Sequence, residues 1–180
     1  MKILKRILFV VLAIIGLALI VALFVKKEMH AEREVVINKP KSEVFSYVKY
    51  LKNQNDYSKW ATMDPAMKKD FKGTDGTVGF VSAWESDKDD VGKGEQEIKG
   101  IKDGERIDYE IRFKKPMEST ASAYMITEAV SGNQSKVRWG FDSKMNYPFN
   151  IMRLFFDVDK MIGDDFETGL TRLKTQLEKQ

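Results

Sequence analysis

The chain has no cysteine and only one histidine among its 180 residues. The absence of cysteine excludes disulfides, cysteine-bound zinc, iron–sulfur clusters and thiol nucleophiles. The single histidine, His30, lies just beyond a hydrophobic segment, so a histidine-rich metal site or a Ser-His-Asp triad in the core is also excluded. The sequence therefore predicts no catalytic residue, no metal site and no cofactor.

A strong excess of charge of one sign is also lacking. Lysine and arginine number 30 and aspartate and glutamate 27, which gives a net charge of +3. Five of the basic residues (Lys2, Lys5, Arg6, Lys26 and Lys27) flank the hydrophobic segment, so the rest of the chain has 25 basic and 27 acidic residues. No block of lysine and arginine follows residue 30. Because nucleic-acid binders concentrate such residues to neutralise phosphates, we expect no nucleic-acid partner.

Only one long apolar run is present, at residues 7–25, and it contains no charged or polar side chain. At 1.5 Å per residue these nineteen residues form a helix of about 28 Å, close to the ~30 Å thickness of the hydrocarbon core. A cleaved signal peptide is the alternative, but its apolar region usually has ~7–15 residues and ends in a small-x-small site. Here Lys26 and Lys27 close the run without such a site. The pattern predicts an uncleaved single-pass anchor.

The charges on either side of this run bear on its orientation. Lys2, Lys5 and Arg6 precede it, and Lys26, Lys27 and Arg33 follow, so the two sides nearly balance. A short basic N-terminus before a first apolar segment is usually retained in the cytoplasm. We therefore expect residues 1–30 to be the anchor with its flank, and residues 31–180 to form an extracytoplasmic soluble domain.

The soluble part begins with a strand and helices. The β-branched run at residues 34–38 ends before Pro40 and predicts a strand, and a helix follows at 42–51. Tyr57, Trp60 and Met63 recur three residues apart and indicate a second short helix within 53–64. Asp75-Gly76 then gives a hairpin signal. Strands are predicted at residues 78–84, 95–101, 106–113, 119–130 and 136–142.

Alternation within two of these strands predicts a sheet with one covered and one wet face. Ile107, Tyr109, Ile111 and Phe113 alternate with charged residues, and Val137, Trp139 and Phe141 do the same. A helical pattern that opens at Pro148 would supply the cover. Its apolar stripe is Phe155, Val158, Ile162, Phe166, Leu170, Leu173 and Leu177.

Residues 149–156 are apolar on nearly all sides. Three interpretations remain open for them: buried core, a gate to a pocket, or a surface that touches lipid. Burial is the default expectation, because this segment opens the helix that covers the sheet.

In this order of elements the chain resembles the START/Bet v 1-like (SRPBCC) superfamily, including polyketide cyclase/dehydratase-like proteins. The stretches that carry the resemblance are residues 35–40 (VVINKP) with Glu43, Val44, Phe45 and Val48, then 57–60 (YSKW), 94–96 (GEQ) and 162–173 (IGDDFETGLTRL). The resemblance covers residues 31–180 and implies an α+β helix-grip fold, in which an antiparallel sheet wraps around a long C-terminal helix. The N-terminal anchor is a departure from many relatives.

The resemblance also implies a ligand class, because members hold lipids, sterols, polyketides or other apolar molecules between sheet and helix. We expect a membrane-anchored domain that binds a hydrophobic small molecule, and its candidate pocket residues are Trp60, Tyr109, Ile111, Phe113, Tyr124, Trp139, Phe141 and Phe155. Core packing is the alternative role for these side chains. Two other functions stay open: a cyclase-like enzyme on an apolar substrate, tested by Tyr109 and Tyr124, and an interaction module with a filled cavity.

Overall fold

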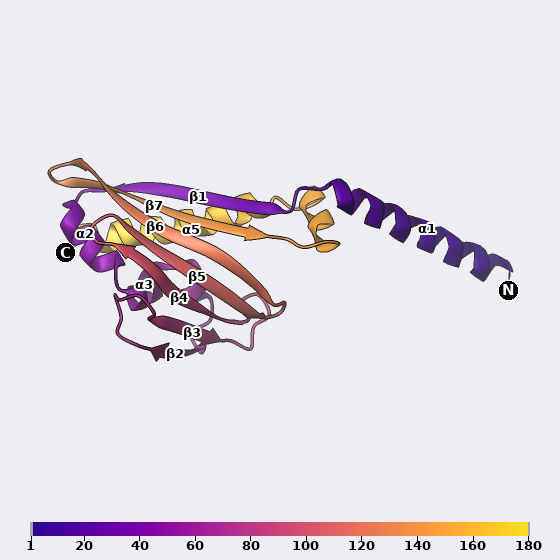
Figure 1. Cartoon of the computed structure of the whole chain (residues 1–180), viewed down its shortest axis with the longest axis horizontal. Helices are drawn as coiled ribbons and strands as arrows, with labels where there is room; N and C mark the ends of the chain where they lie inside the picture. The colour runs from indigo at the N-terminus through magenta and orange to yellow at the C-terminus, as the bar shows by residue number, and fades with distance from the viewer. Residues whose placement is uncertain (1, 180) are drawn as a thin grey trace. The chain divides into compact units, whose positions relative to one another are not determined.

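The computed structural model describes residues 2–179, in which seven strands form one antiparallel sheet (Figure 1). The spatial order is β1-β7-β6-β5-β4-β3-β2, so β2 to β7 form a meander and β1 returns beside β7. The strands are β1 (Glu28–Ile37), β2 (Lys68–Lys72), β3 (Val81–Glu85), β4 (Lys93–Lys102), β5 (Arg106–Lys115), β6 (Ser119–Ser131) and β7 (Gln134–Lys144).

Helical segments precede, interrupt and follow the sheet. They are α1 (Lys2–Phe24), α2 (Lys41–Val48), the 3-10 turn η1 (Leu51–Asn53), α3 (Gln54–Tyr57), α4 (Lys59–Met63), the 3-10 segment η2 (Phe149–Leu154) and α5 (Val158–Glu178). Figure 1 shows α5 running alongside strands β1, β7 and β6. This arrangement is the helix-grip fold that the sequence predicted.

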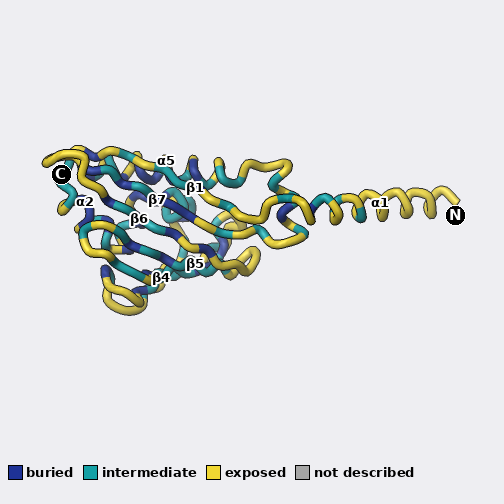
Figure 2. Tube along the Cα trace, turned by 45° about the horizontal axis from the view of Figure 1, so that its top comes forward, coloured by how far each residue is buried: buried dark blue, intermediate teal, exposed yellow. Residues whose placement is uncertain are grey.

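The inner face of the sheet follows the alternation in the sequence. Ile107 and Tyr109 in β5 and Val137 and Trp139 in β7 are buried, whereas the charged residues between them, Asp108 and Arg138, are half-buried. Figure 2 shows this alternation between buried and intermediate residues along the central strands. Because side chains alternate across a strand, one face is left to pack against α5. Phe166, Leu170, Leu173 and Leu177 of α5 are buried in the same core.

The outer face carries ion pairs instead of an apolar core. Arg112 of β5 contacts Glu95 and Glu97 of β4, each at 2.7 Å, and it also pairs with Glu110. Lys114 reaches the second oxygen of Glu95 at 2.6 Å. These cross-strand pairs keep a solvent-facing sheet surface polar.

Strand β2 has no counterpart among the predicted strands, and several boundaries differ from the expectation, two of them by six residues or more. Strand β1 starts at Glu28 rather than at residue 34, and the C-terminal helix starts at Val158 rather than at Pro148. Residues 149–154 instead form i to i+3 turns, with hydrogen bonds such as Ile151 N to Pro148 O. The side chain of Asn150 donates to the carbonyls of Ala22 in α1 and of Val25 just after it, so this segment packs on the end of α1 and does not continue α5.

The chain forms two compact units. One contains residues up to Met29 together with Lys144–Val158, and the other contains His30–Ser143 together with the chain from Asp159 onward. Within the first unit, α1 is long and apolar enough to cross a membrane, a property that signal sequences share. Most of α1 is exposed (Figure 2).

The expected burial of residues 149–156 is wrong. Phe149, Met152, Leu154, Phe155 and Phe156 are between 44% and 76% exposed. Within this segment the side chain that is fully buried is polar, that of Asn150. The apolar character of the segment therefore does not serve the core.

Candidate functional site

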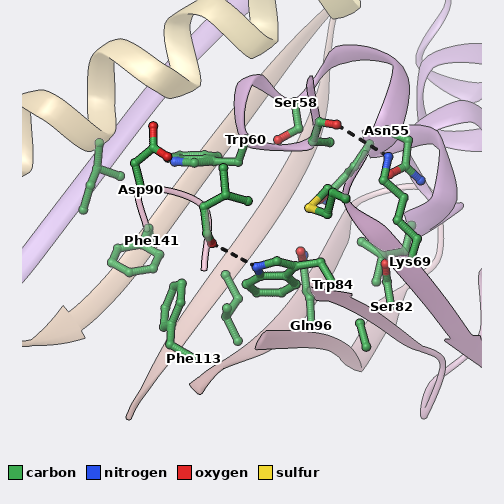
Figure 3. Close-up of a pocket in the computed structure, with 18 of the residues that line it drawn as sticks. Asn55, Ser58, Trp60, Lys69, Ser82, Trp84, Asp90, Gln96, Phe113 and Phe141 are labelled. Atoms are coloured by element: carbon green, nitrogen blue, oxygen red, sulfur yellow. Dashed lines mark hydrogen bonds between the residues drawn. The ribbon is translucent and has the colours of Figure 1, made fainter. Parts of the chain in front are cut away.

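A cavity of about 350 Å³ lies in the larger unit between the inner face of the sheet, the α3–α4 segment and α5. Its walls combine aromatic side chains with a few polar ones (Figure 3). The lining consists of Leu51, Gln54, Asn55, Ser58, Trp60, Ala61, Met67, Lys69, Ser82, Ala83, Trp84, Asp89, Asp90, Val91, Gln96, Ile111, Phe113, Lys115, Pro116, Trp139, Phe141, Ile162 and Phe166. The volume falls in the range of small-molecule sites, roughly 300–1,000 Å³.

One wall is a cluster of three aromatic rings from three elements. Trp139 of β7 stacks on Phe166 of α5, with ring centroids 4.6 Å apart. Trp60 of α4 meets both rings edge-on, at 6.5 Å from Trp139 and 5.5 Å from Phe166. Gly169 leaves room for the stack, because a Cβ there would lie 3.0 Å from Cζ3 of Trp139. Helix, sheet and the α4 segment therefore meet at this wall.

A second wall is formed by Trp84 of β3 and Phe113 of β5, whose rings meet edge-on at 6.1 Å. The Trp84 indole donates a hydrogen bond of 3.2 Å to the carbonyl of Val91 in the β3–β4 loop, shown in Figure 3. Gly94 faces this ring on β4, and a Cβ at Gly94 would lie 2.5 Å from Cζ2 of Trp84. Only glycine at this position lets the indole lie flat against the strand.

The loops beside the cavity are held by Asp64, which is 8% exposed. Its carboxylate accepts hydrogen bonds from the Ser86 hydroxyl at 2.5 Å and from the Ala66 backbone N–H at 3.0 Å. The Ser86 bond is the main cause that lowers the pKa of Asp64. An ionised Asp64 thus ties the segment after α4 to the β3–β4 loop.

The uncharged polar residues of the lining are Gln54, Asn55, Ser58, Ser82 and Gln96. Gln54 is 8% exposed, and its Nε2 atom has no hydrogen-bond partner among residues 2–179. The hydroxyl of Tyr109 is also buried and also has no hydrogen-bond partner among residues 2–179. Burial raises the pKa of Tyr109, and the nearby Gln54 side chain lowers it by a smaller amount. Tyr109 is therefore held in its neutral form, which can donate a hydrogen bond.

Charged lining residues belong to the exposed rim. Lys69, Asp89, Asp90 and Lys115 all line the cavity and are exposed. Among residues 2–179, no group of three His, Asp or Glu side chains is placed to hold a metal ion. The interior thus offers apolar contact and hydrogen bonding, with charge only at the edge.

The structure brings five of the eight expected pocket residues to this cavity: Trp60, Ile111, Phe113, Trp139 and Phe141. Tyr109 lies on the same inner face but is packed in the core at 2% exposure and is not part of the lining. Tyr124 and Phe155 lie elsewhere, for separate reasons.

Tyr124 points to the outer face because its neighbours Ala123 and Met125 take the inward positions of β6. Its hydroxyl donates to Glu32 of β1, and the guanidinium of Arg106 lies 4.4 Å from its ring centroid. Phe155 follows η2 in the other compact unit and is 76% exposed. Phe155 is not part of the apolar stripe of α5, because this helix begins only at Val158.

Sequence reasoning did not find the polar lining residues Gln54, Ser82 and Gln96. Polar side chains at inward positions interrupt the apolar alternation and therefore carry no periodic signal. The pairing of Ser82 with Gln96, and of Trp84 with Gly94, shows that these positions share the inner face.

The fold and this cavity define a protein of the Bet v 1-like helix-grip class. The sequence matches a family described as "Polyketide cyclase / dehydrase and lipid transport" over residues 28–178, and the chain belongs to this family. No curated protein sequence gives a significant match.

Several solved structures share the fold. XoxI from Bacillus cereus has 16% identity and a TM-score of 0.59, with 83% of this chain and 95% of that chain covered. Ara h 8.0201 has 15% identity and a TM-score of 0.58, with 85% and 99% covered. Norcoclaurine synthase from Thalictrum flavum, solved in complex with dopamine and hydroxybenzaldehyde, has 6% identity and a TM-score of 0.63, with 89% and 92% covered.

Proposed function

We propose that this protein is a membrane-anchored domain that binds a hydrophobic small molecule or lipid between the sheet and α5. The cavity of about 350 Å³ carries the proposal, because aromatic side chains line it between the sheet and α5. Family membership supports the proposal, because the description of the family includes lipid transport. Norcoclaurine synthase, which shares the fold, was solved with two small molecules bound.

The lining favours a ligand with an apolar body and few polar atoms. The two aromatic walls offer stacking surfaces, whereas Gln54, Ser82 and Gln96 offer isolated hydrogen bonds. An amphiphile with a hydroxyl, carbonyl or ester group matches this chemistry. Burying its apolar surface would contribute about 25 cal/mol per Å² to binding.

The apolar run of residues 7–25 is proposed to remain as a single-pass anchor, with the ligand-binding domain of residues 31–180 outside the cytoplasm. Its length supports the span, and Lys2, Lys5 and Arg6 support the orientation. An impermeant thiol reagent tests the side, since the chain has no cysteine of its own. A Val130→Cys variant should be labelled in intact cells, and labelling only after lysis would place the domain in the cytoplasm.

The test of binding is native mass spectrometry of the full chain purified in detergent, followed by solvent extraction. The expected result is one apolar molecule bound per chain. A protein that carries none and also refuses added phospholipids and fatty acids would contradict the proposal and favour an interaction module.

A matched pair of variants locates the site. Ser82→Phe places a phenyl ring in the cavity, whereas Ser122→Phe adds the same ring on the outer face of β6. Ligand should be lost from Ser82→Phe alone. Equal loss from both variants, or from neither, would place the ligand somewhere else.

A further inference from the structure

Exposed apolar side chains gather in the segment that follows β7 and precedes α5 along the chain. We define the 149–156 patch as Phe149, Met152, Leu154, Phe155 and Phe156, which are 51%, 44%, 57%, 76% and 53% exposed. Soluble surfaces carry single exposed apolar residues, but a contiguous cluster of this size usually marks an interaction site. The patch therefore needs an occupant.

The patch is joined to the last turn of α1 by a buried side chain. The Asn150 amide donates two hydrogen bonds through Nδ2, one to the Ala22 carbonyl at 2.7 Å and one to the Val25 carbonyl at 2.9 Å. Asn150 and Ala22 are both fully buried. A backbone bond of 2.8 Å from Met145 N to Lys27 O adds a third link. All these residues belong to one compact unit.

These bonds meet a need that arises where a helix ends. The last carbonyls of a helix have no partner inside the helix and are normally satisfied by water or by caps. Near hydrocarbon, water is scarce and an unpaired carbonyl is costly. A buried amide that satisfies one carbonyl in the last turn of α1 and that of Val25 just after it fits an end that lies at the edge of a bilayer.

The depth of the attachment also fits. Val25 is the last residue of the apolar run, and Lys26 and Lys27 follow it directly. Ala22 precedes Val25 by three residues, which is about 4.5 Å along a helix. Interfacial apolar groups reach about 5–10 Å into the boundary between headgroups and acyl chains. The patch is thus tied to α1 at the level where such groups reside.

We propose that the 149–156 patch inserts into the interface of the same bilayer that α1 spans, as a second and shallow membrane contact. The proposal rests on the proposed anchoring by α1. Its occupant is lipid: the patch is attached to the apolar run itself, and exposed Lys26 and Lys27 beside it favour anionic headgroups.

Site-directed spin labelling of the full chain tests this inference, because every introduced cysteine is the only one. Labels are placed at Phe155→Cys in the patch, Leu12→Cys within α1, and Val130→Cys as an exposed site in the other unit. The protein is reconstituted into vesicles of phosphatidylcholine with phosphatidylglycerol. Collisions with oxygen, which concentrates in the bilayer, are compared with collisions with a water-soluble nickel chelate.

At position 155 the ratio of oxygen to nickel accessibility should lie between the high value at position 12 and the low value at position 130. A ratio at 155 equal to that at 130, with position 12 in the bilayer, overturns the inference alone. Protection of 155 from both reagents would mean that protein covers the patch, and it also overturns the inference. A label at position 12 that lies in water overturns the anchoring and the inference together.

A variant pair then tests the link. Asn150→Ala removes both bonds to α1, whereas Asn146→Ala removes an exposed amide in the same segment. In Asn150→Ala the label at 155 should move toward water while the label at 12 does not move. An unchanged depth of the label at 155 would refute the role of Asn150 in holding the patch near α1. Whether the patch inserts into the bilayer interface is decided by the depth of this label in the chain with native Asn150.

Discussion

Trp139 and Phe166 stack with their ring planes inclined by only 21° and their centroids 4.6 Å apart. The contact joins β7 to α5, so it holds the terminal helix on the sheet. The same two rings line the cavity. The same pair of side chains therefore stabilises the fold and would contact the proposed ligand.

Phe166→Ala should lower the free energy of unfolding by about 3–5 kcal/mol, because it removes a buried ring and leaves a void beside Trp139. Urea unfolding of the detergent-solubilised chain, followed by tryptophan fluorescence, measures the loss. Met117→Ala, at a position 56% exposed, should change it by less than about 0.5 kcal/mol. A loss of similar size in both variants would show that the Trp139–Phe166 stack contributes no more to stability than an exposed side chain does.

Gly94→Ala should destabilise the fold by about 1–3 kcal/mol, since its new methyl group would overlap the Trp84 ring and the carbonyl oxygen of Arg112. Displacing the Trp84 ring should also weaken ligand binding. The matched control is Gly132→Ala in the β6–β7 turn, where a Cβ meets nothing within 4 Å. Thermal unfolding and ligand retention by native mass spectrometry are the readouts, and tolerance of alanine at both positions would contradict the packing argument.

Stability should fall at alkaline pH because of two buried tyrosines. Burial raises the pKa of Tyr57 and of Tyr109 above the ordinary value. Between that value, about 10, and the folded values, the unfolded chain loses these protons and the native chain keeps them. The stabilisation is thus complete below about pH 10 and declines above it. Tyr109→Phe should flatten the decline, and an unchanged slope would rule out this cause.

The loss of folding stability at acid pH should depend on Arg112. Its hydrogen bond is the largest cause that lowers the pKa of Glu97, while Lys114 and then Arg112 lower that of Glu95. Stability from these pairs is present above the ordinary carboxyl value of about 4.3 and is lost as the pH falls through the folded values.

Arg112→Met should therefore destabilise the chain by about 1 kcal/mol or less at neutral pH, with a shallower acid decline. Added salt should shrink the difference. The control Arg172→Met removes an arginine whose guanidinium donates to the Thr62 hydroxyl instead of to a carboxylate. Denaturant midpoints measured across pH decide the matter; identical acid profiles for wild type and Arg112→Met would contradict the network.

Much of the fold was accessible from the sequence because burial of one sheet face imposes a period of two. Ile107, Tyr109, Val137 and Trp139 were placed correctly on that basis. Tyr124 was misplaced since β6 puts the small residues Ala121 and Ala123 inward, a pattern with weak hydrophobic contrast. Phe155 fitted the helical stripe by spacing alone, and only the contact of Asn150 with α1 reveals why the helix starts later.

The residues of the cavity were accessible only in part, because a cavity is defined by the space that several segments leave unfilled. Trp60 and Phe141 could be proposed as aromatic residues on the expected inner surface. Gln54 contributes through the meeting of α3 with the sheet, and no local pattern encodes such a meeting.

Strand β2 ends the sheet, and its free edge has a consequence for a chain held on a surface. An unpaired edge is a template for another strand, and tethering many copies in two dimensions would bring such edges together often. Strand β2 is only five residues long and carries Lys68, Lys69 and Lys72. Like charges would face each other if two such edges met, so, under the proposed anchoring, neighbouring copies on a membrane should not pair through β2.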